Sequence, residues 1–181
     1  MKKSIVITTI NGPTEAIKKY SCFEDYEIIV VGDKKTPKNW HCDNVEYLSV
    51  DKQNEIGHHL NKVLPYNHYC RKMMGYIYAI RNNTEIIIDT DDDNIPKNNW
   101  GFPDTKGKYL HIEANNAFIN IYQLFTTDKI WPRGLPLVLI QKDFHLSDKL
   151  VNDYSNVGIW QGLADGDPDV DAIYRLTNNS A

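Results

Sequence analysis

Acidic side chains concentrate directly after one apolar run of the sequence. Asp89, Asp91, Asp92 and Asp93 follow the isoleucines at positions 86–88. Carboxylates this close repel one another unless a cation or water compensates their charge. Mg²⁺ and Mn²⁺ accept one or two carboxylates and take further oxygen ligands from substrate phosphates. We therefore expect a divalent metal here. The alternative is a solvated acidic turn. An EF-hand is disfavoured, because this sequence has no glycine at the sixth loop position and no glutamate at the twelfth.

A second acidic group alternates with other residue types. It comprises Asp165, Asp167, Asp169 and Asp171. If this segment is extended, alternation places carboxylates two residues apart on one face. One of them could then act as general base for an acceptor hydroxyl. The alternative is a turn built on Gly166 and Pro168.

The charge of the chain is uneven. The net charge is −4, from 20 basic and 24 acidic residues, and eight of the acidic residues lie in these two groups. The remainder is therefore mildly basic, and the negative charge is local. This distribution argues against a nucleic-acid-binding surface and for a bound cation.

The sequence also bears on the cellular compartment in which we expect the protein. No apolar run approaches the roughly 18 residues of a membrane-spanning helix, and the N-terminus has no apolar core of a signal peptide. The three cysteines form no Cys-x-x-Cys pair, so we expect reduced thiols rather than disulfides or a zinc site. We predict a cytoplasmic protein without a transmembrane segment.

The elements that must position these residues alternate along the first half. We expect strands at 4–10, 27–31, 45–50 and 85–88, and helices at 13–22, 51–64 and 69–80. In the last helix, apolar residues at helical spacing predict the buried face: Tyr69, Met73, Tyr76, Ile77 and Ile80. Such alternation predicts an α/β fold with a mostly parallel sheet flanked by helices. The second half is less regular, with expected strands at 109–112 and 118–122.

Polar residues follow three of the predicted strands. They are Thr8, Thr9 and Asn11; Gly32 and Asp33; and residues 89–93. Ligands of parallel α/β sheets bind at the carboxyl ends of the strands. We therefore expect one ligand site at this edge.

Two further residues are candidates for contacts with a nucleotide. Asp33 could accept hydrogen bonds from a base or ribose, and Arg71 could reach a diphosphate as a permanently charged donor. The alternatives are an aspartate in a glycine turn and a surface arginine on an amphipathic helix.

Five segments of the chain resemble a known family. They are VVGDKKTPKNW (30–40), LPYNHYCRKMMGYIYAI (64–80), IIIDTDDDN (86–94), IWPRGLPL (130–137) and GIWQGLADGDPDVDAIYRLT (158–177). In this order they resemble the STELLO-type glycosyltransferases. They are more distantly similar to the plant reversibly glycosylated polypeptides, which are UDP-arabinopyranose mutases.

The resemblance implies a GT-A fold, a nucleoside-diphosphate-sugar donor and a divalent metal. The Asp-x-Asp motif of GT-A enzymes maps onto residues 91–93, which implies that Asp91 and Asp93 hold Mn²⁺ or Mg²⁺ and that Asp92 contacts the donor. On this reading the nucleoside would lie against Asp33 and the loop containing Thr8, Thr9 and Asn11, with Arg71 at the phosphates.

The similarity to the mutases implies which residues form the part of the site that handles the sugar. Their Arg-Gly-x-Pro segment matches residues 133–136, and their Asp-x-Asp-Ala segment matches residues 169–172. Arg133 is therefore expected at the donor sugar. Asp167, Asp169 or Asp171 is expected to orient or deprotonate the hydroxyl of a glycan or other acceptor.

Two departures from the family affect this reading. Plant STELLO-type proteins carry a membrane anchor, and family members usually continue beyond the last matched segment into a part that helps build the acceptor side. We expect a single domain over 1–181 that is either truncated at its C-terminus or a minimal version. Donor binding is thus a firmer expectation than acceptor chemistry.

The sequence predicts a metal-dependent glycosyltransferase that uses a UDP-sugar. Arg133 keeps open a sugar mutase or self-glycosylating protein, and a non-catalytic nucleotide-sugar-binding scaffold or a calcium-binding interaction domain are further alternatives. A sugar nucleotidyltransferase is disfavoured because no glycine-rich phosphate loop follows the first strand. The identity of the sugar and the oligomeric state stay open.

Overall fold

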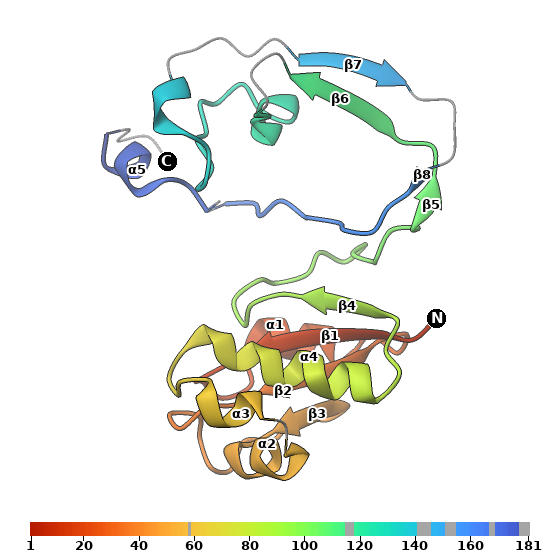
Figure 1. Cartoon of the computed structure of the whole chain (residues 1–181), viewed down its shortest axis with the longest axis vertical. Coiled ribbons are helices and arrows are strands. Elements are labelled where there is room, and N and C mark those ends of the chain that lie inside the picture. Colours follow the sequence, from red (N-terminus) through yellow and green to blue (C-terminus); the bar gives the residue numbers. More distant parts are fainter. Residues whose placement is uncertain (58, 115–117, 141–145, 151–154, 167–168, 178–181) are drawn as a thin grey trace. The chain divides into compact units, whose positions relative to one another are not determined.

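A computed structural model shows two compact units, Met1–Trp100 and Gly101–Ala181 (Figure 1). It describes residues 1–57, 59–114, 118–140, 146–150, 155–166 and 169–177. The first unit is a parallel sheet with helices, and the second is less regular, so the predicted α/β class is confirmed. That the chain functions as a single domain stays a prediction.

The first unit has a Rossmann-like arrangement. Its elements are β1 (Lys3–Thr8), α1 (Glu15–Tyr20), β2 (Glu27–Val31), β3 (Val45–Leu48), α2 (Val50–Ile56), α3 (Leu60–Val63), the 3₁₀ turn η1 (Tyr69–Arg71), α4 (Lys72–Arg81) and β4 (Ile86–Asp89). The four strands are all parallel in the order β3-β2-β1-β4. This order places β1 inside the sheet, between β2 and β4, so that its end lies beside the acidic end of β4.

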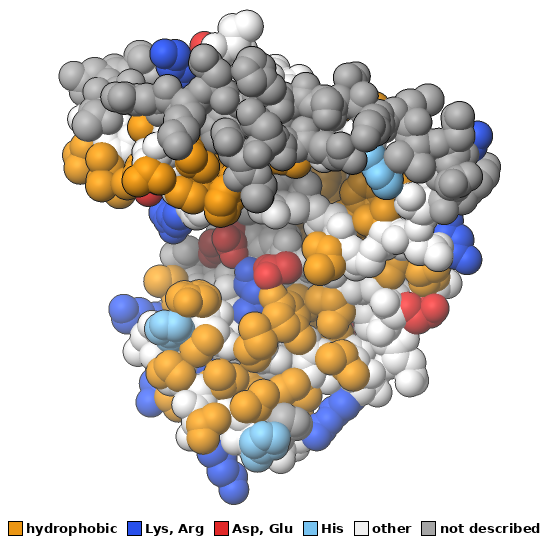
Figure 2. Space-filling view, turned by 45° about the horizontal axis from the view of Figure 1, so that its top comes forward, with side chains coloured by type: hydrophobic (Ala, Val, Ile, Leu, Met, Phe, Trp, Pro, Cys, Tyr) orange, Lys and Arg blue, Asp and Glu red, His pale blue; other side chains and the backbone are white. Residues whose placement is uncertain are grey.

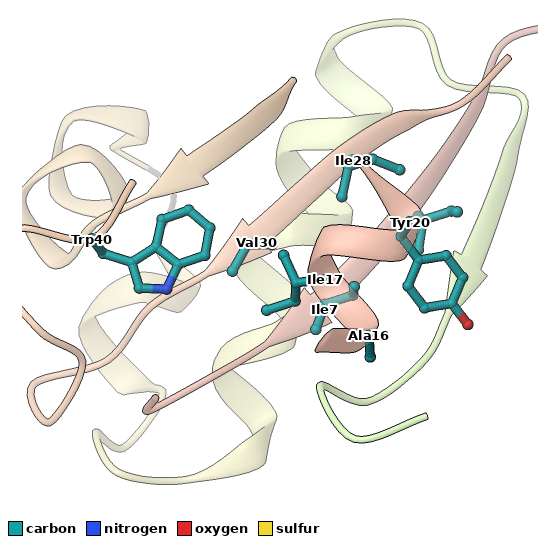
Figure 3. Packing of buried hydrophobic residues seen from close by; sticks show 8 residues of the cluster. Ile7, Ala16, Ile17, Tyr20, Ile28, Val30 and Trp40 are labelled. Atoms are coloured by element: carbon teal, nitrogen blue, oxygen red, sulfur yellow. The ribbon is translucent and has the colours of Figure 1, made fainter. Parts of the chain in front are cut away.

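One face of the sheet packs against α1. Ile5 and Ile7 of β1 and Ile28 and Val30 of β2 point to this face. They meet Ala16, Ile17 and Tyr20 of α1, with Trp40 at the margin, as Figure 3 shows. Residues two apart in a strand share a face, so every second residue of each strand enters this core.

The other face packs against α4, and the approach is close. Val6 and Val31 lie on this face together with Met74 and Ala79 of the helix. A methyl group added to Gly75 would lie 2.5 Å from Val6 Cγ1 and 2.7 Å from Val31 Cγ2. Burial on both faces explains why the β2 sequence, EIIVV, is almost entirely apolar.

Two predicted helices have different ends in the structure. The first begins after Thr14 rather than Gly12, because the Thr14 hydroxyl accepts the Ile17 amide at 3.3 Å and caps the helix. The expected helix at 51–64 is two helices. Gly57 ends α2 with a φ of +66°, a left-handed conformation that glycine adopts without strain.

The predicted buried face of α4 is wrong in part. Tyr69, Met73 and Ile80 are exposed, at 80%, 42% and 62% of their surface. Hydrophobic side chains gather on the surface of this unit, as Figure 2 shows. The residues that face the protein interior are instead mostly small or polar: Arg71, Lys72, Met74, Gly75 and Ala79. Close packing on the sheet favours small residues at the contact.

The second unit consists of short antiparallel pairs and turns. β5 (Lys106–Gly107) pairs with β8 (Ser155–Asn156), and β6 (Leu110–Ala114) pairs with β7 (Leu146–Leu150). Two 3₁₀ turns, η2 (Ile121–Leu124) and η3 (Leu137–Leu139), and the helix α5 (Ala172–Thr177) complete it. The predicted strand at 118–122 is wrong, because Asn120 accepts the Tyr122 amide at 3.3 Å and starts η2.

Two sequence-based expectations concern the whole chain. All three cysteines are free thiols, as expected. Within the described part of the chain, no helix combines the length and the apolar character that crossing a membrane requires.

We predict that Gly75→Ala destabilises the first unit. Overpacking of a tight core costs about 1–3 kcal/mol, which exceeds the gain of about 0.5–1 kcal/mol from replacing a helical glycine by alanine. Urea unfolding would measure the difference. Gly12→Ala is the matched control, because nothing lies within 4 Å of the added methyl group. A Gly75→Ala protein as stable as the parent would contradict the close approach of α4.

Candidate functional site

The loop after β1 and the acidic loop after β4 are joined by side-chain hydrogen bonds. Thr9 Oγ1 donates to Asp92 Oδ2 at 2.5 Å, and Asn11 Nδ2 donates to the same oxygen at 3.2 Å. Thr14 Oγ1 donates to the Asp92 carbonyl at 2.5 Å. Thr8, the last residue of β1, pairs with Val31 beside them. The structure therefore brings the residues expected at these two strand ends together.

Asp33 connects the end of β2 to the same region. Its carboxylate accepts the backbone amides of Lys34 at 2.7 Å and His68 at 3.4 Å, and the residue is buried. Thr36 Oγ1 accepts the Asp33 amide at 2.8 Å and donates to the Thr9 carbonyl at 2.8 Å. A short chain of bonds thus runs from Asp33 through Thr36 to Thr9.

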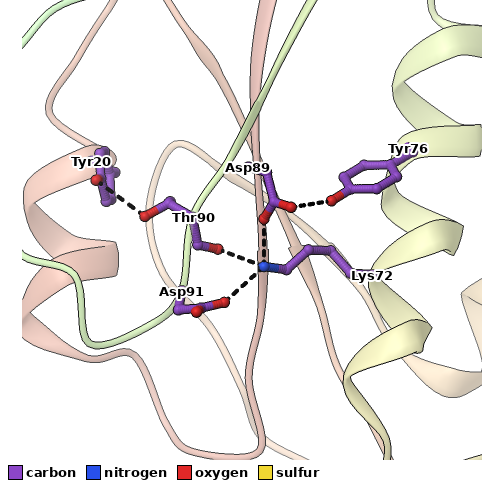
Figure 4. Close-up of polar contacts among 6 residues, drawn as sticks. All are labelled: Tyr20, Lys72, Tyr76, Asp89, Thr90 and Asp91. Atoms are coloured by element: carbon purple, nitrogen blue, oxygen red, sulfur yellow. Dashed lines mark hydrogen bonds and ion pairs between the residues drawn. The ribbon is translucent and has the colours of Figure 1, made fainter. Parts of the chain in front are cut away.

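Lys72 lies among the acidic side chains (Figure 4). Its Nζ atom contacts Asp89 Oδ1 at 2.5 Å, Asp91 Oδ1 at 2.8 Å and the Thr90 carbonyl at 3.0 Å. These three acceptors match the three protons of an ammonium group. Tyr76, one turn further along α4, donates its hydroxyl to Asp89 Oδ2 at 2.5 Å. The acidic strand end therefore already contains a cation of the protein.

The protonation of Lys72 and Tyr76 follows from this arrangement. Burial acts to lower the pKa of Lys72, but the hydrogen bonds and charges of Asp89 and Asp91 outweigh it, and the pKa is raised. Burial raises the pKa of Tyr76, and its bond to Asp89 raises it further. At neutral pH the lysine is charged and the tyrosine keeps its proton.

Asp91 and Asp93 are both exposed at the end of β4. Their carboxylate oxygens are the hard ligands that Mg²⁺ and Mn²⁺ prefer. Across the described residues, no three His, Cys, Asp or Glu side chains are arranged to hold a metal. Two exposed carboxylates would leave coordination positions of such an ion open to water or phosphate oxygens. Asp91 and Asp93 as metal ligands, and Asp92 as a donor contact, stay predictions.

Arg71 is buried, with 1% of its surface exposed. Nε and Nη2 donate to Gln53 Oε1, Nη2 also donates to Asn61 Oδ1 at 2.5 Å, and Nη1 lies 3.4 Å from the carbonyls of Asn61 and Leu64. Its guanidinium carbon lies 4.6 Å from the ring centroid of Tyr66. The alternative of a surface arginine is wrong. A phosphate contact stays a prediction, and it requires Arg71 to exchange one of these partners.

In the second unit the two mutase-like segments pair with each other. Arg133 Nη2 lies 2.9 Å from Asp169 Oδ1, and the Arg133 amide donates to the Asp169 carbonyl at 3.0 Å. The Asp171 amide donates to the Trp131 carbonyl at 3.0 Å. Asp167 lies outside the described residues. Arg133 and Asp169 are both exposed, so the structure places them together at a surface.

Asp171 has a structural role at the start of α5. Its Oδ1 atom accepts the amides of Ile173 at 2.8 Å and Tyr174 at 3.4 Å. This is the pattern of an N-cap, in which an aspartate satisfies amides of the first helical turn. A general-base role for Asp171 stays a prediction, and such a role would compete with this cap.

Sequence reasoning assigned no role to Lys72, Tyr76 or Asp89 individually. A signal was present, because Lys72 and Tyr76 are four residues apart and such pairs lie on one face of a helix. The apolar spacing of the same segment counted Tyr76 as a core residue and left Lys72 out. It therefore concealed the polar pair that contacts the acidic loop.

We predict that Arg71→Lys lowers the stability of the first unit by about 2–3 kcal/mol, because a lysine cannot satisfy the acceptors left by the guanidinium and each buried unsatisfied group costs about 1–3 kcal/mol. Urea unfolding would measure the loss. Arg81→Lys is the control, since Arg81 bonds the Ile56 carbonyl at an exposed site, and a change within about 0.5 kcal/mol is expected. Equal stability of both variants would contradict the buried network.

We predict that Asp171→Ala destabilises α5 by about 1 kcal/mol, whereas Asp171→Asn changes it little, because asparagine caps a helix about as well as aspartate. Amide hydrogen exchange in residues 172–177 would measure the effect. Equally fast exchange in both variants would show that the carboxylate charge, and not the cap, stabilises this helix.

Comparison with known proteins finds two similar proteins. No protein-family model matches the chain. It is 30% identical over 192 aligned residues to a protein of Arabidopsis thaliana named probable glycosyltransferase STELLO1, and 29% identical to probable glycosyltransferase STELLO2 of the same plant. Each match covers 99% of this chain and 25% of the relative, so the chain spans about a quarter of the length of these proteins. The similarity confirms the resemblance of this chain to the STELLO-type glycosyltransferase family.

Proposed function

We propose that this chain is the nucleotide-sugar-binding part of a glycosyltransferase. The observation that carries the proposal is the bond from Asp92 to Thr9, which joins the acidic loop to the carboxyl end of the central strand. A ligand of a parallel sheet binds at this edge. The names of the two relatives agree with transfer of a sugar.

The donor in this proposal is a UDP-sugar. Asp33, with Thr8, Thr9 and Asn11, would hold the nucleoside, and Asp91 and Asp93 would hold Mn²⁺ or Mg²⁺ beside Asp92. A bound divalent ion would neutralise the diphosphate and stabilise it as a leaving group. The backbone amides of Lys34 and His68 keep the Asp33 carboxylate oriented, which would preserve its geometry for a base or ribose.

The reaction would move a sugar from the diphosphate to a hydroxyl group. A bond forms between the hydroxyl oxygen of the acceptor and the anomeric carbon of the sugar. The bond from that carbon to the β-phosphate oxygen breaks, and the nucleoside diphosphate leaves with the electron pair. The proton of the acceptor goes to a carboxylate, for which Asp167, Asp169 and Asp171 are the candidates.

A sugar mutase or self-glycosylating protein is the second candidate. The observation that favours it is the pairing of the two mutase-like segments through Arg133 and Asp169. Incubation with a UDP-sugar followed by intact-mass measurement separates the two functions. A covalent mass increase of one sugar would identify self-glycosylation.

We predict that UDP binds to the protein with Mn²⁺ and that a chelator weakens this binding by at least about tenfold, within the usual range of coupling between two ligands. Asp91→Asn/Asp93→Asn should remove the metal-dependent part, because it removes two charged oxygen ligands. Calorimetric titration of UDP measures both effects. Asp43→Asn is the matched control, since the Asp43 side chain is 92% exposed and contacts only His41 among the partners described.

Three results would contradict the proposal or a part of it. Absence of UDP binding with and without Mn²⁺ would exclude the UDP-sugar donor. Binding that is independent of the metal and of both aspartates would exclude the metal site but retain a nucleotide site. Binding without transfer to any acceptor would favour the non-catalytic scaffold.

A further inference from the structure

The acidic strand end combines a proposed metal site with a buried lysine that already binds its carboxylates. The Lys72 Nζ atom lies 2.8 Å from Oδ1 of Asp91, which is a proposed metal ligand. It contacts Asp89 Oδ1 at 2.5 Å. A cation is therefore in place between two carboxylates before any metal binds.

The position of this lysine is fixed by its surroundings. The Lys72 side chain is only 10% exposed, whereas Asp89 and Asp91 are 57% and 66% exposed. It is the first residue of α4, whose next turn packs closely on the sheet at Gly75. The ammonium group is thus the more buried partner in both pairs, and the second oxygen of Asp89 accepts the Tyr76 hydroxyl.

A metal ion and the ammonium group would repel each other at this site. Both are cations, both would bind Asp91, and burial limits how far solvent can screen them. A nucleoside diphosphate brings further negative charge, which would balance two neighbouring cations. The charge of the ligand would then decide whether the metal stays bound.

We propose that Lys72 sets the metal requirement of this site, because its ammonium competes with a divalent metal for Asp91 unless a diphosphate is bound as well. Lys72 is in this sense a positioning residue of the donor site. The inference rests on the metal site of the proposed function. The competition at Asp91 makes metal binding and diphosphate binding depend on each other, since coupling between two ligands is reciprocal.

The test is titration of Mn²⁺ alone into the full chain and its variants. The electron paramagnetic resonance signal of free Mn²⁺ measures how much of the metal is bound. Lys72→Met should bind Mn²⁺ at least about tenfold more tightly than the parent, within the usual range of coupling between two sites. Lys72→Arg keeps the charge and should stay close to the parent. Asp91→Asn added to Lys72→Met should abolish the gain.

Lys52→Met is the matched control. Lys52 forms an ion pair with Glu46 in the same unit, so its loss removes one positive charge and one ion pair elsewhere. Its Mn²⁺ affinity should equal that of the parent. An equal gain in Lys52→Met would attribute the effect to net charge and would overturn the proposal.

Circular dichroism and thermal unfolding would check that the variants are folded. Lys72→Gln is a second charge-removing variant that keeps a hydrogen-bond donor, and it should gain Mn²⁺ affinity as Lys72→Met does. For the parent protein, side-chain nitrogen spectra of labelled lysine give an independent measurement, in which saturating Mg²⁺ should shift the Lys72 signal. An unshifted signal, unchanged or weaker Mn²⁺ binding in Lys72→Met, or absence of Mn²⁺ binding in every variant would each overturn the proposal.

Titration of UDP into the same proteins separates this inference from the proposed function. If Lys72→Met gains Mn²⁺ affinity but UDP binds none of the proteins, the competition at Asp91 is correct and the nucleotide-sugar function is wrong. If UDP binds the parent with Mn²⁺ and Lys72→Met gains no metal affinity, only the role of Lys72 is wrong.

Discussion

The carboxyl ends of β2 and β3 depend on the hydrogen bonds that the buried guanidinium of Arg71 makes. A charge taken from water is costly unless its hydrogen bonds are satisfied, and here every N–H of Arg71 has an acceptor. Those acceptors are Gln53, Asn61 and Leu64. Gln53 in turn donates to the carbonyls of Gly32 and Leu48 at 2.8 Å each. One side chain thereby connects α2, α3 and η1 with the ends of β2 and β3.

Two neighbouring basic residues have different partners because their chemistry differs. Arg71 is planar and has five donors, which suits several neutral acceptors at once. Lys72 is a compact point charge, which suits the converging oxygens of Asp89, Thr90 and Asp91. The turn from η1 into α4 directs the first toward α2 and α3 and the second toward the acidic loop. The order of the two residues is therefore essential to both networks.

Much of the first unit could be predicted from sequence because its signals are local. Apolar β-branched runs identify the strands, and their alternation with helices implies parallel pairing. The face of α4 could not be predicted this way, since hydrophobic spacing gives weight to large residues such as Tyr69 and Ile80. The actual contact is made through Gly75, because the valines of β1 and β2 leave no room for a side chain there.

The candidate site was predictable as a location but not as a network. Asp33, Thr9 and Asp92 follow from the rule that strand ends converge, whereas Lys72 is separated from Asp89 by 17 residues and no local pattern joins them. In the second unit, the contact between Arg133 and Asp169 joins segments 36 residues apart. Such pairing depends on tertiary structure that short segments do not specify.

The chain of bonds from Asp33 through Thr36 and Thr9 to Asp92 has a consequence for how ligands bind. Immobilising a loop reduces its conformational entropy, and two linked loops lose much of that freedom together. If a nucleoside binds at Asp33, as proposed above, it would also order the acidic loop through these two hydroxyl groups. The entropic cost of fixing the diphosphate end would then be smaller, so the two halves of one ligand would bind cooperatively without any change in the shape of the sheet.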